Sequence, residues 1–153
     1  MKKFLILFLF LIGIKDARSQ SFKELNDSLI YYYQGKNFDR AIPFAEKLVV
    51  FVKENYGEEN KVYPIYLNML AGLYLQKGQL KKTEEVLIKA NQVIQKVAGD
   101  KSEELIKGYT LLAIVYNGLG EDDKAIPFLI KAMENYKKEK GETDSDYAAS
   151  LNK

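Results

Sequence analysis

The chain has 153 residues, of which 47% are hydrophobic and 29% are charged, and its formal net charge is +2. This balance is typical of one globular domain and excludes a disordered tail. The sequence contains no histidine and no cysteine, which excludes Ser-His-Asp and Cys-His catalysis, the common zinc sites and disulfide bonds. We therefore expect no enzymatic activity, no metal site and no cofactor.

Residues 1–19 have the pattern of a secretory signal peptide. Two lysines precede an apolar run over residues 4–14, and the small residues Ala17 and Ser19 predict cleavage before Gln20. An uncleaved membrane anchor is the alternative, but the run is shorter than the roughly 20 residues that a bilayer-spanning helix needs. We expect an exported protein, either periplasmic or secreted.

Cleavage would change the charge balance of the chain. Residues 1–19 contain four basic and one acidic side chain, so 19 basic and 20 acidic residues remain and the mature net charge is −1. Nucleic-acid binding needs a basic face, so we expect no nucleic-acid partner, and no membrane contact in the mature form.

The mature sequence repeats itself every 42 residues, and Ala-Ile-Pro-Phe occurs at both 41–44 and 125–128. Such a period indicates a stack of repeated helix pairs. The register is also kept by Tyr32, Tyr74 and Tyr116; by Gly57, Gly99 and Gly141; and by Ala41, Thr83 and Ala125. The predicted repeats cover about 22–57, 60–99 and 102–141, with a partial fourth over 144–153.

The first repeat is irregular in its opening helix. Leu25, Leu29 and Tyr32 fit a helical apolar stripe, but Ser28 stands where the later repeats have leucine. Terminal repeats are often atypical because one of their faces meets solvent.

The second repeat predicts helices over about 61–77 and 80–97, each followed by a glycine, as is common past a helix C-terminus. Leucine, alanine and tyrosine side chains recur at the spacing of one buried helical face. The predicted core stripe consists of Leu67, Leu70, Ala71 and Tyr74, then Thr83, Val86, Leu87, Ala90 and Ile94.

The third repeat follows the same plan. Its predicted core stripe consists of Tyr109, Leu112, Ala113 and Tyr116, then Ala125, Phe128, Leu129 and Ala132. A fourth repeat then begins, because Tyr147 and Leu151-Asn152 stand in the register of Tyr63 and Leu67-Asn68. We expect residues from about 143 onward to be frayed, because two isolated helical turns are not stable.

The repeat pattern, large–x2–Leu-Ala–x2–Tyr–x3–Gly–x4–Ala–x6–Ala, is similar to the tetratricopeptide repeat, whose usual unit has about 34 residues. The longer unit of this chain, with Leu67-Asn68 before Leu-Ala and with Ala41-Ile42-Pro43, resembles the kinesin light chain subtype. The resemblance is strong over 60–140 and weaker over 20–59. It implies an all-α, right-handed solenoid of stacked antiparallel helix pairs.

Candidate site residues follow from this architecture. The adjacent carboxylates at 58–59, 84–85 and 122–123 cannot share a ligand on a helix and are interpreted as solvated surface. In a solenoid the first helix of each pair lines the concave face. The first-helix residues that avoid the core stripe are Asn26, Ile30, Tyr33, Gln34, Asn68, Gly72, Leu75, Gln76, Thr110, Ile114 and Asn117.

These residues are predicted to bind a peptide or a helix of a partner protein. Asn26, Asn68, Thr110 and Asn152 share one register and are expected to form a ladder of hydrogen-bonding side chains along an extended peptide. The predicted function is an exported interaction module, a scaffold or adaptor. The alternative is the N-terminal recruiting arm of a larger signalling or protease protein, of which this chain is a truncated part.

Overall fold

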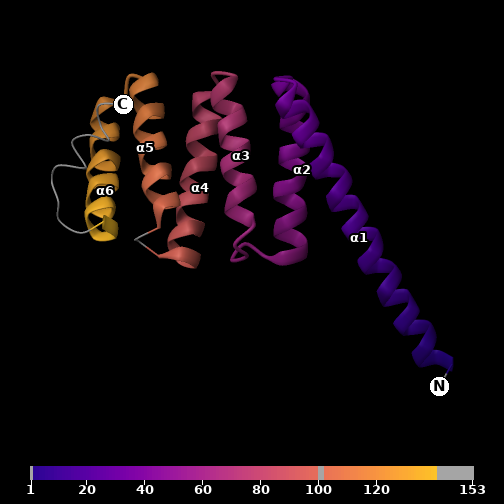
Figure 1. Ribbon diagram of the computed structural model, residues 1–153. Helices are drawn as coiled ribbons and strands as arrows, with labels where there is room; N and C mark the ends of the chain where they lie inside the picture. The colour runs from indigo at the N-terminus through magenta and orange to yellow at the C-terminus, as the bar shows by residue number, and fades with distance from the viewer. Residues whose placement is uncertain (1, 100–101, 141–153) are drawn as a thin grey trace.

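The structure is a computed structural model that describes the backbone of residues 2–99 and 102–140, and the side chains of residues 18–99 and 102–137. Within these residues it consists of helices joined by short turns, with no strand (Figure 1). The helices are α1 (Lys2–Gln34), α2 (Phe38–Tyr56), α3 (Tyr63–Gln76), α4 (Leu80–Ala98), α5 (Glu103–Gly118) and α6 (Asp122–Lys140). The predicted all-α solenoid is confirmed.

The helices stand in one row, in chain order, and each helix packs against the next one (Figure 1). The pairs α1/α2, α3/α4 and α5/α6 are the first, second and third repeats. Helices α3 and α4 begin and end within two residues of the predicted bounds. The N-terminal half of α1 extends away from the row, so the stack begins with the C-terminal half of this helix (Figure 1).

The turns inside the repeats share one backbone conformation. Gly78 and Gly120 follow the first helices of their repeats with φ angles of 67° and 73°, a region that glycine enters without strain. Lys36 occupies the same register in the first repeat and also has a positive φ, 54°. A side chain in this conformation costs roughly 1–2 kcal/mol, so the first repeat keeps the turn of the others despite a less suitable residue.

The predicted stripes form the core. Leucine, alanine and tyrosine residues of α3 and α5 face the second helices, and Thr83 of α4 is buried among them with its hydroxyl donating to the Gln79 carbonyl at 3.1 Å. In the irregular first repeat, Leu29 is fully buried. Ser28 donates its hydroxyl to the Glu24 carbonyl at 2.8 Å, so the serine is satisfied within its own helix.

Leu129 was predicted to lie in the core, and this prediction is wrong. Its side chain is 40% exposed, together with Ile126 and Ile130 on the same face of α6. The residue at the equivalent position of the second repeat, Leu87, is 1% exposed because α5 packs over it. Among the described helices none follows α6, so the apolar face of α6 lacks the cover that α4 receives.

The predicted fourth repeat lies outside the described residues. Pro43 and Pro127 lie inside α2 and α6, as expected from the repeated Ala-Ile-Pro-Phe. Across the part of the chain that is described, no helix combines the length and the apolar character needed to cross a membrane.

Candidate functional site

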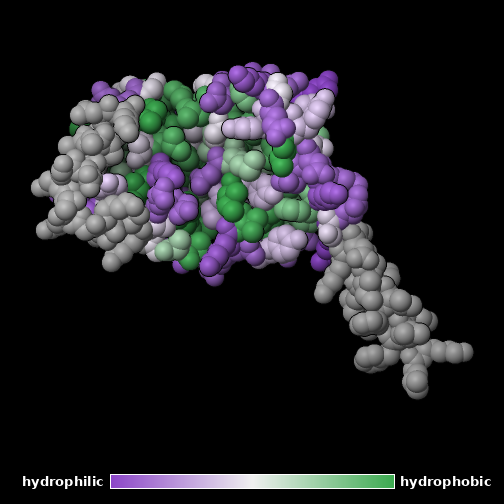
Figure 2. Space-filling view, viewed as in Figure 1, coloured by the Kyte–Doolittle hydropathy of each residue, from purple (hydrophilic) through white to green (hydrophobic). Residues whose placement is uncertain are grey.

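Most of the predicted site residues are on the surface. We call the surface formed by them on α1, α3 and α5 the first-helix face. Its exposed members are Ile30, Tyr33, Gln34, Gly72, Gln76, Thr110, Ile114 and Asn117. On the side of the molecule seen in Figure 2, apolar and hydrophilic side chains are intermixed over the described helices.

Leu75 was predicted to offer apolar contact on this face. It is only half-exposed, because its side chain packs against the buried cluster that contains Leu112 and Val115. Leu75 therefore contributes to the packing between the second and third repeats as well as to the surface.

The three described members of the predicted ladder, Asn26, Asn68 and Thr110, are not equivalent. Asn26 is already engaged, because its Oδ1 accepts the Tyr66 hydroxyl at 2.8 Å. Thr110 donates its hydroxyl to the Ile106 carbonyl of its own helix at 3.0 Å, and position 152 lies outside the described residues. Asn68 differs from both, because its Oδ1 is buried and has no hydrogen-bond partner.

Asn68 lines a cleft of about 450 Å³ between the second and third repeats. We call it the inter-repeat cleft. Its wall is mainly apolar, and it carries one lysine and one glutamate, both exposed. The residues that line it are Lys61, Pro64, Ile65, Asn68, Ile94, Val97, Ala98 and Glu104. An apolar cleft with one unpaired amide oxygen fits a side chain that combines an apolar body with a hydrogen-bond donor.

The packing between α4 and α5 beside this cleft is unusually close. Gly108 of α5 faces Asn91 of α4, and a Cβ atom at Gly108 would lie 1.8 Å from Asn91 Oδ1. Asn91 is 4% exposed, yet neither its Oδ1 nor its Nδ2 has a partner. An unpaired buried polar group costs about 1–3 kcal/mol, so stability alone does not explain this asparagine.

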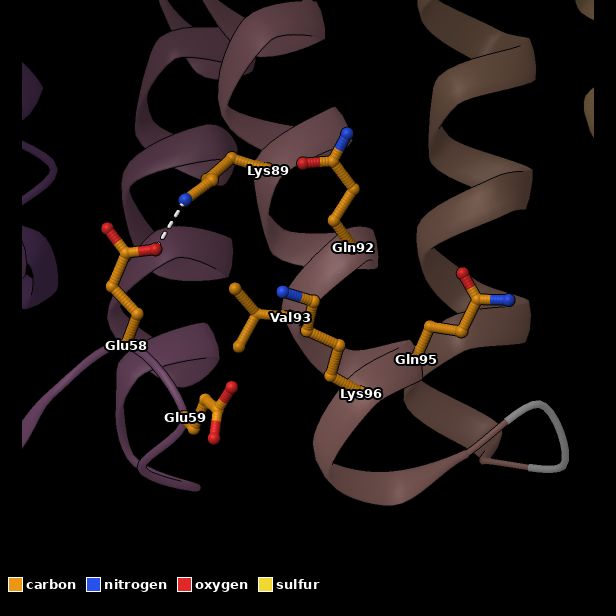
Figure 3. A pocket seen from close by; sticks show the side chains of 7 residues that line it. All are labelled: Glu58, Glu59, Lys89, Gln92, Val93, Gln95 and Lys96. Atoms are coloured by element: carbon orange, nitrogen blue, oxygen red, sulfur yellow. Dashed lines mark hydrogen bonds and ion pairs between the residues drawn. The ribbon is translucent and has the colours of Figure 1, made fainter.

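A second cavity, of about 470 Å³, lies between the α2–α3 loop and α4 (Figure 3). Glu58 in this loop pairs with Lys89 of α4 at 2.6 Å and with Lys53 of α2 at 2.7 Å. The hydrogen bonds from Lys53 and Lys89 lower the pKa of the Glu58 carboxyl to about 2. Glu58 remains a third exposed, and its two ion pairs link the α2–α3 loop to both α2 and α4. Its charge is already neutralised, so this cavity makes a weaker site than the inter-repeat cleft.

The buried tyrosines are structural, as the repeat pattern predicts. The Tyr74 hydroxyl donates to Glu46, and burial raises the pKa of Tyr74 above its usual range. Burial, and then a hydrogen bond with Glu84, raise the pKa of Tyr116 to about 12. Glu84, which was predicted to be solvated, is half-buried and forms a hydrogen bond with Tyr116. No cluster of acidic side chains with metal-binding geometry is found among the described residues.

Several residues of the cleft were not predicted from the sequence. Ile65 and Ala98 are exposed and carry no recognisable motif, and Glu104 resembles any acidic residue in the first turn of a helix. Gly108 could have been found by comparing each position with its equivalents in the other repeats, because the second repeat has Tyr66 there.

The tetratricopeptide repeat family matches residues 61–138. The chain is 28% identical to bovine (Bos taurus) intraflagellar transport protein 70A over 130 residues, which cover 82% of this chain and 19% of that protein. It is 28% identical to kinesin light chain-related protein 1 of Arabidopsis thaliana over 98 residues, 63% of this chain and 16% of the other. The chain therefore spans less than a fifth of the length of these relatives.

A solved structure shows the same arrangement of helices. The crystal structure of BtubC (BKLC) from P. vanneervenii superposes with a TM-score of 0.67 at 22% sequence identity. The superposition covers 76% of this chain and 46% of that one. At this identity the likeness shows the fold.

Proposed function

Because the chain belongs to the tetratricopeptide repeat family, whose members are in general protein-interaction modules, we propose that it is an exported adaptor. Its first-helix face binds an extended segment of a partner protein. The observation that carries this proposal is the combination of an exposed polar and aliphatic face with one unpaired amide oxygen, Asn68 Oδ1, in an apolar cleft. A bound peptide backbone or side chain supplies the hydrogen bond that the protein itself does not make.

Gly72 allows this proposal to be tested without disturbing the fold. It lies at an exposed position in the middle of α3, and no atom is within 4 Å of a Cβ built there. Gly72→Arg therefore places a long charged side chain on the first-helix face without a clash, and it replaces a poor helix former. Gly72→Ala is the matched control, since it changes the helix propensity without blocking the face.

Binding peptides are selected from a randomised 12-residue display library on the full chain, and their affinities are measured by calorimetry. We expect Gly72→Arg to abolish binding and Gly72→Ala to retain it. Asn68→Ala should weaken binding by about 1–3 kcal/mol, because it leaves a buried peptide group unpaired. Peptides that bind Gly72→Arg as tightly as the unmodified chain would show that the binding site lies elsewhere, for example on α2, α4 and α6.

Export is the second part of the proposal. Phe22 of α1 packs against the core, whereas Arg18, Ser19 and Gln20 are exposed. Cleavage before Gln20 would therefore leave the packed part of α1 in place. N-terminal sequencing of protein recovered from the exported fraction should find Gln20 first, whereas Met1 or Lys2 on membrane-bound protein would favour an anchor.

A recruiting role inside a longer protein is the second candidate. It is favoured by the exposed apolar face of α6 around Leu129, which a further helix pair would cover, and by the small share of each relative that the chain spans. A transcript whose reading frame continues with more repeats and an effector domain would support it.

A further inference from the structure

The inter-repeat cleft can be compared with the equivalent positions between the first and second repeats, where larger side chains are present. Between the first and second repeats four aromatic residues pack together. Phe22 of α1 contacts the rings of Phe51, Tyr56 and Tyr66 at centroid distances of 5.7, 6.5 and 5.9 Å. We call this group the aromatic cluster.

All four aromatic residues are replaced by smaller ones in the next repeat. Moving each position by 42 residues leads from Phe22, Phe51, Tyr56 and Tyr66 to Pro64, Val93, Ala98 and Gly108. Of these, Pro64 and Ala98 line the inter-repeat cleft, and Gly108 lies beside it on α5, one turn after Glu104. Two of the four positions that carry aromatic rings in the preceding interface therefore line the cleft, whereas Val93 lines the second cavity and Gly108 faces Asn91.

A hydrogen bond of the first interface also has no counterpart at the inter-repeat cleft. In the aromatic cluster, the Tyr66 hydroxyl donates to Asn26 Oδ1 at 2.8 Å. The equivalent of Asn26 is Asn68, which is retained, but the equivalent of Tyr66 is Gly108, which has no side chain to donate. The acceptor is kept and the donor is lost, and Asn68 Oδ1 is left buried without a partner.

We propose that a tyrosine side chain of the bound partner enters the inter-repeat cleft and donates its hydroxyl to Asn68, in place of the tyrosine that Gly108 replaces. The inference rests on the proposed binding of a peptide on the first-helix face. Asn68 reaches the hydroxyl by rotation of its amide about χ2, a torsion with a broad energy minimum. The partner thereby completes an interaction that the chain builds for itself one repeat earlier.

The chemistry of the cleft selects tyrosine over other side chains. The apolar wall of Pro64, Ile65 and Ile94 suits an aromatic ring, whereas a carboxylate or an ammonium group would lose its hydration there. The exposed Lys61 and Glu104 have opposite charges, so they favour neither sign. A phosphorylated tyrosine would bring a double negative charge and no hydroxyl donor beside Asn68, so phosphorylation of the partner is expected to prevent binding.

The experiment uses three probes that differ at one residue: acetyl-Ala-Ala-Tyr-Ala-Ala-amide and the same peptide with phenylalanine or phosphotyrosine. Each is titrated into the ¹⁵N-labelled full chain and followed by amide chemical shifts. We expect the tyrosine peptide to shift the resonances of residues 61–68, 94–98 and 104. It should bind about two- to tenfold tighter than the phenylalanine peptide, the range given by one net hydrogen bond. The phosphotyrosine peptide should not saturate.

Two substitutions of Asn68 distinguish the contribution of the hydrogen bond to binding from the contribution of the shape of the cleft. Asn68→Leu keeps the size of the side chain and removes the acceptor, so it should bring the ratio of the two affinities to about 1. Asn68→Asp keeps an acceptor and should preserve the preference for tyrosine. A preference that survives in Asn68→Leu would overturn the proposal.

A further pair of variants tests the location. Ala98→Tyr restores the aromatic residue found at position 56 and should fill the cleft, so that none of the probes binds. Gln92→Tyr adds the same side chain to an exposed position of the same helix and should leave binding unchanged. Equal affinities of the tyrosine and phenylalanine peptides for the unmodified chain, or binding unaffected by Ala98→Tyr, would contradict the proposal.

These outcomes are distinct from a failure of the proposed function. Display-selected peptides that are blocked by Gly72→Arg but bind Ala98→Tyr normally would keep the first-helix face as the binding site and exclude the cleft. Peptides whose affinity is unchanged by both Gly72→Arg and Ala98→Tyr would exclude the first-helix face as the binding site.

Discussion

The two interfaces between neighbouring repeats are built from the same positions of the 42-residue unit but differ in what fills them. Between the first and second repeats, aromatic rings pack around Phe22 and the amide of Asn26 is bonded. Between the second and third, small residues leave a cleft of about 450 Å³ and the amide oxygen of Asn68 is unpaired. Neighbouring helices pack in chain order at both interfaces, so the second interface forms without aromatic rings at these positions.

The comparison distinguishes an interface whose residues stabilise the fold from one whose residues are available to bind a partner. The first interface gains apolar burial and a satisfied hydrogen bond. The second contains buried polar atoms of Asn68 and Asn91 without partners, which lower stability. Local conflicts of this kind are expected at functional sites, where a fold gives up stability for binding.

The largest effect is expected when the first interface is made to resemble the second. Tyr66→Gly removes a side chain that is 7% exposed, leaves Asn26 unpaired and places a glycine inside α3. Together these changes should lower the free energy of unfolding by about 4 kcal/mol, measured by urea denaturation. Tyr66→Phe is the control and should cost only about 1 kcal/mol, because it removes the hydroxyl alone. A loss below about 2 kcal/mol for Tyr66→Gly would mean that the first interface does not depend on its rings.

The opposite change should stabilise the second interface. Asn91→Val gives α4 the residue that α2 has at the equivalent position 49, and it removes two buried polar atoms without partners. We expect the free energy of unfolding to rise by about 1–3 kcal/mol. The matched substitution Val49→Asn should lower it by a similar amount. A drop in stability for Asn91→Val would show that the amide makes a compensating interaction, for example with a buried water.

The two equivalent asparagines should respond differently to truncation. Asn26→Ala leaves the Tyr66 hydroxyl buried without an acceptor and should cost about 1 kcal/mol. Asn68→Ala removes an amide whose Oδ1 is already unpaired, so the melting temperature should stay nearly unchanged. Thermal unfolding followed by circular dichroism measures both. An Asn68→Ala variant that melts well below the unmodified chain would assign this asparagine a structural role.

The smallest effect concerns the loop between the two interfaces. The pKa of Glu58 is lowered from 4.5 to about 2 by its hydrogen bonds with Lys53 and Lys89. The carboxylate therefore stabilises the fold above pH 4.5, and this contribution is lost as the pH falls toward 2. Glu58→Gln should lower the melting temperature slightly at pH 7 and not at all at pH 2. A difference that does not change with pH would exclude the ion pair as its cause.

Much of the fold could be predicted from the 42-residue register, because helical spacing and glycine turns are local properties of the sequence. Leu129 shows where this reasoning fails. Its position in the repeat is a core position, but burial also requires a following helix, and the sequence of one repeat does not contain that information. The ion pairs of Glu58 were not predicted for a similar reason, since its two lysine partners come from different helices.

The candidate site was predicted only in part. The register placed Asn68 on the first-helix face, but it also suggested that Asn26 and Asn68 are equivalent. Their difference depends on the residues at positions 66 and 108, which lie on the next helix pair. A comparison of every position across the repeats contains this signal, whereas a search for the shared residues alone does not.

The uncovered face of α6 has a consequence for the dynamics of the stack. Each repeat is held by its neighbours, so local opening is easiest where a neighbour is lacking. Among the described helices, α6 packs chiefly against α5, whereas α3 and α4 have a helix on both sides. Amide protons of α6, like those of α1 at the other end of the row, should therefore exchange with deuterium faster than those of α3 and α4. The inter-repeat cleft lies at the boundary between the slow and the fast part, so binding there should slow the exchange of α5 and α6 along the rest of the row.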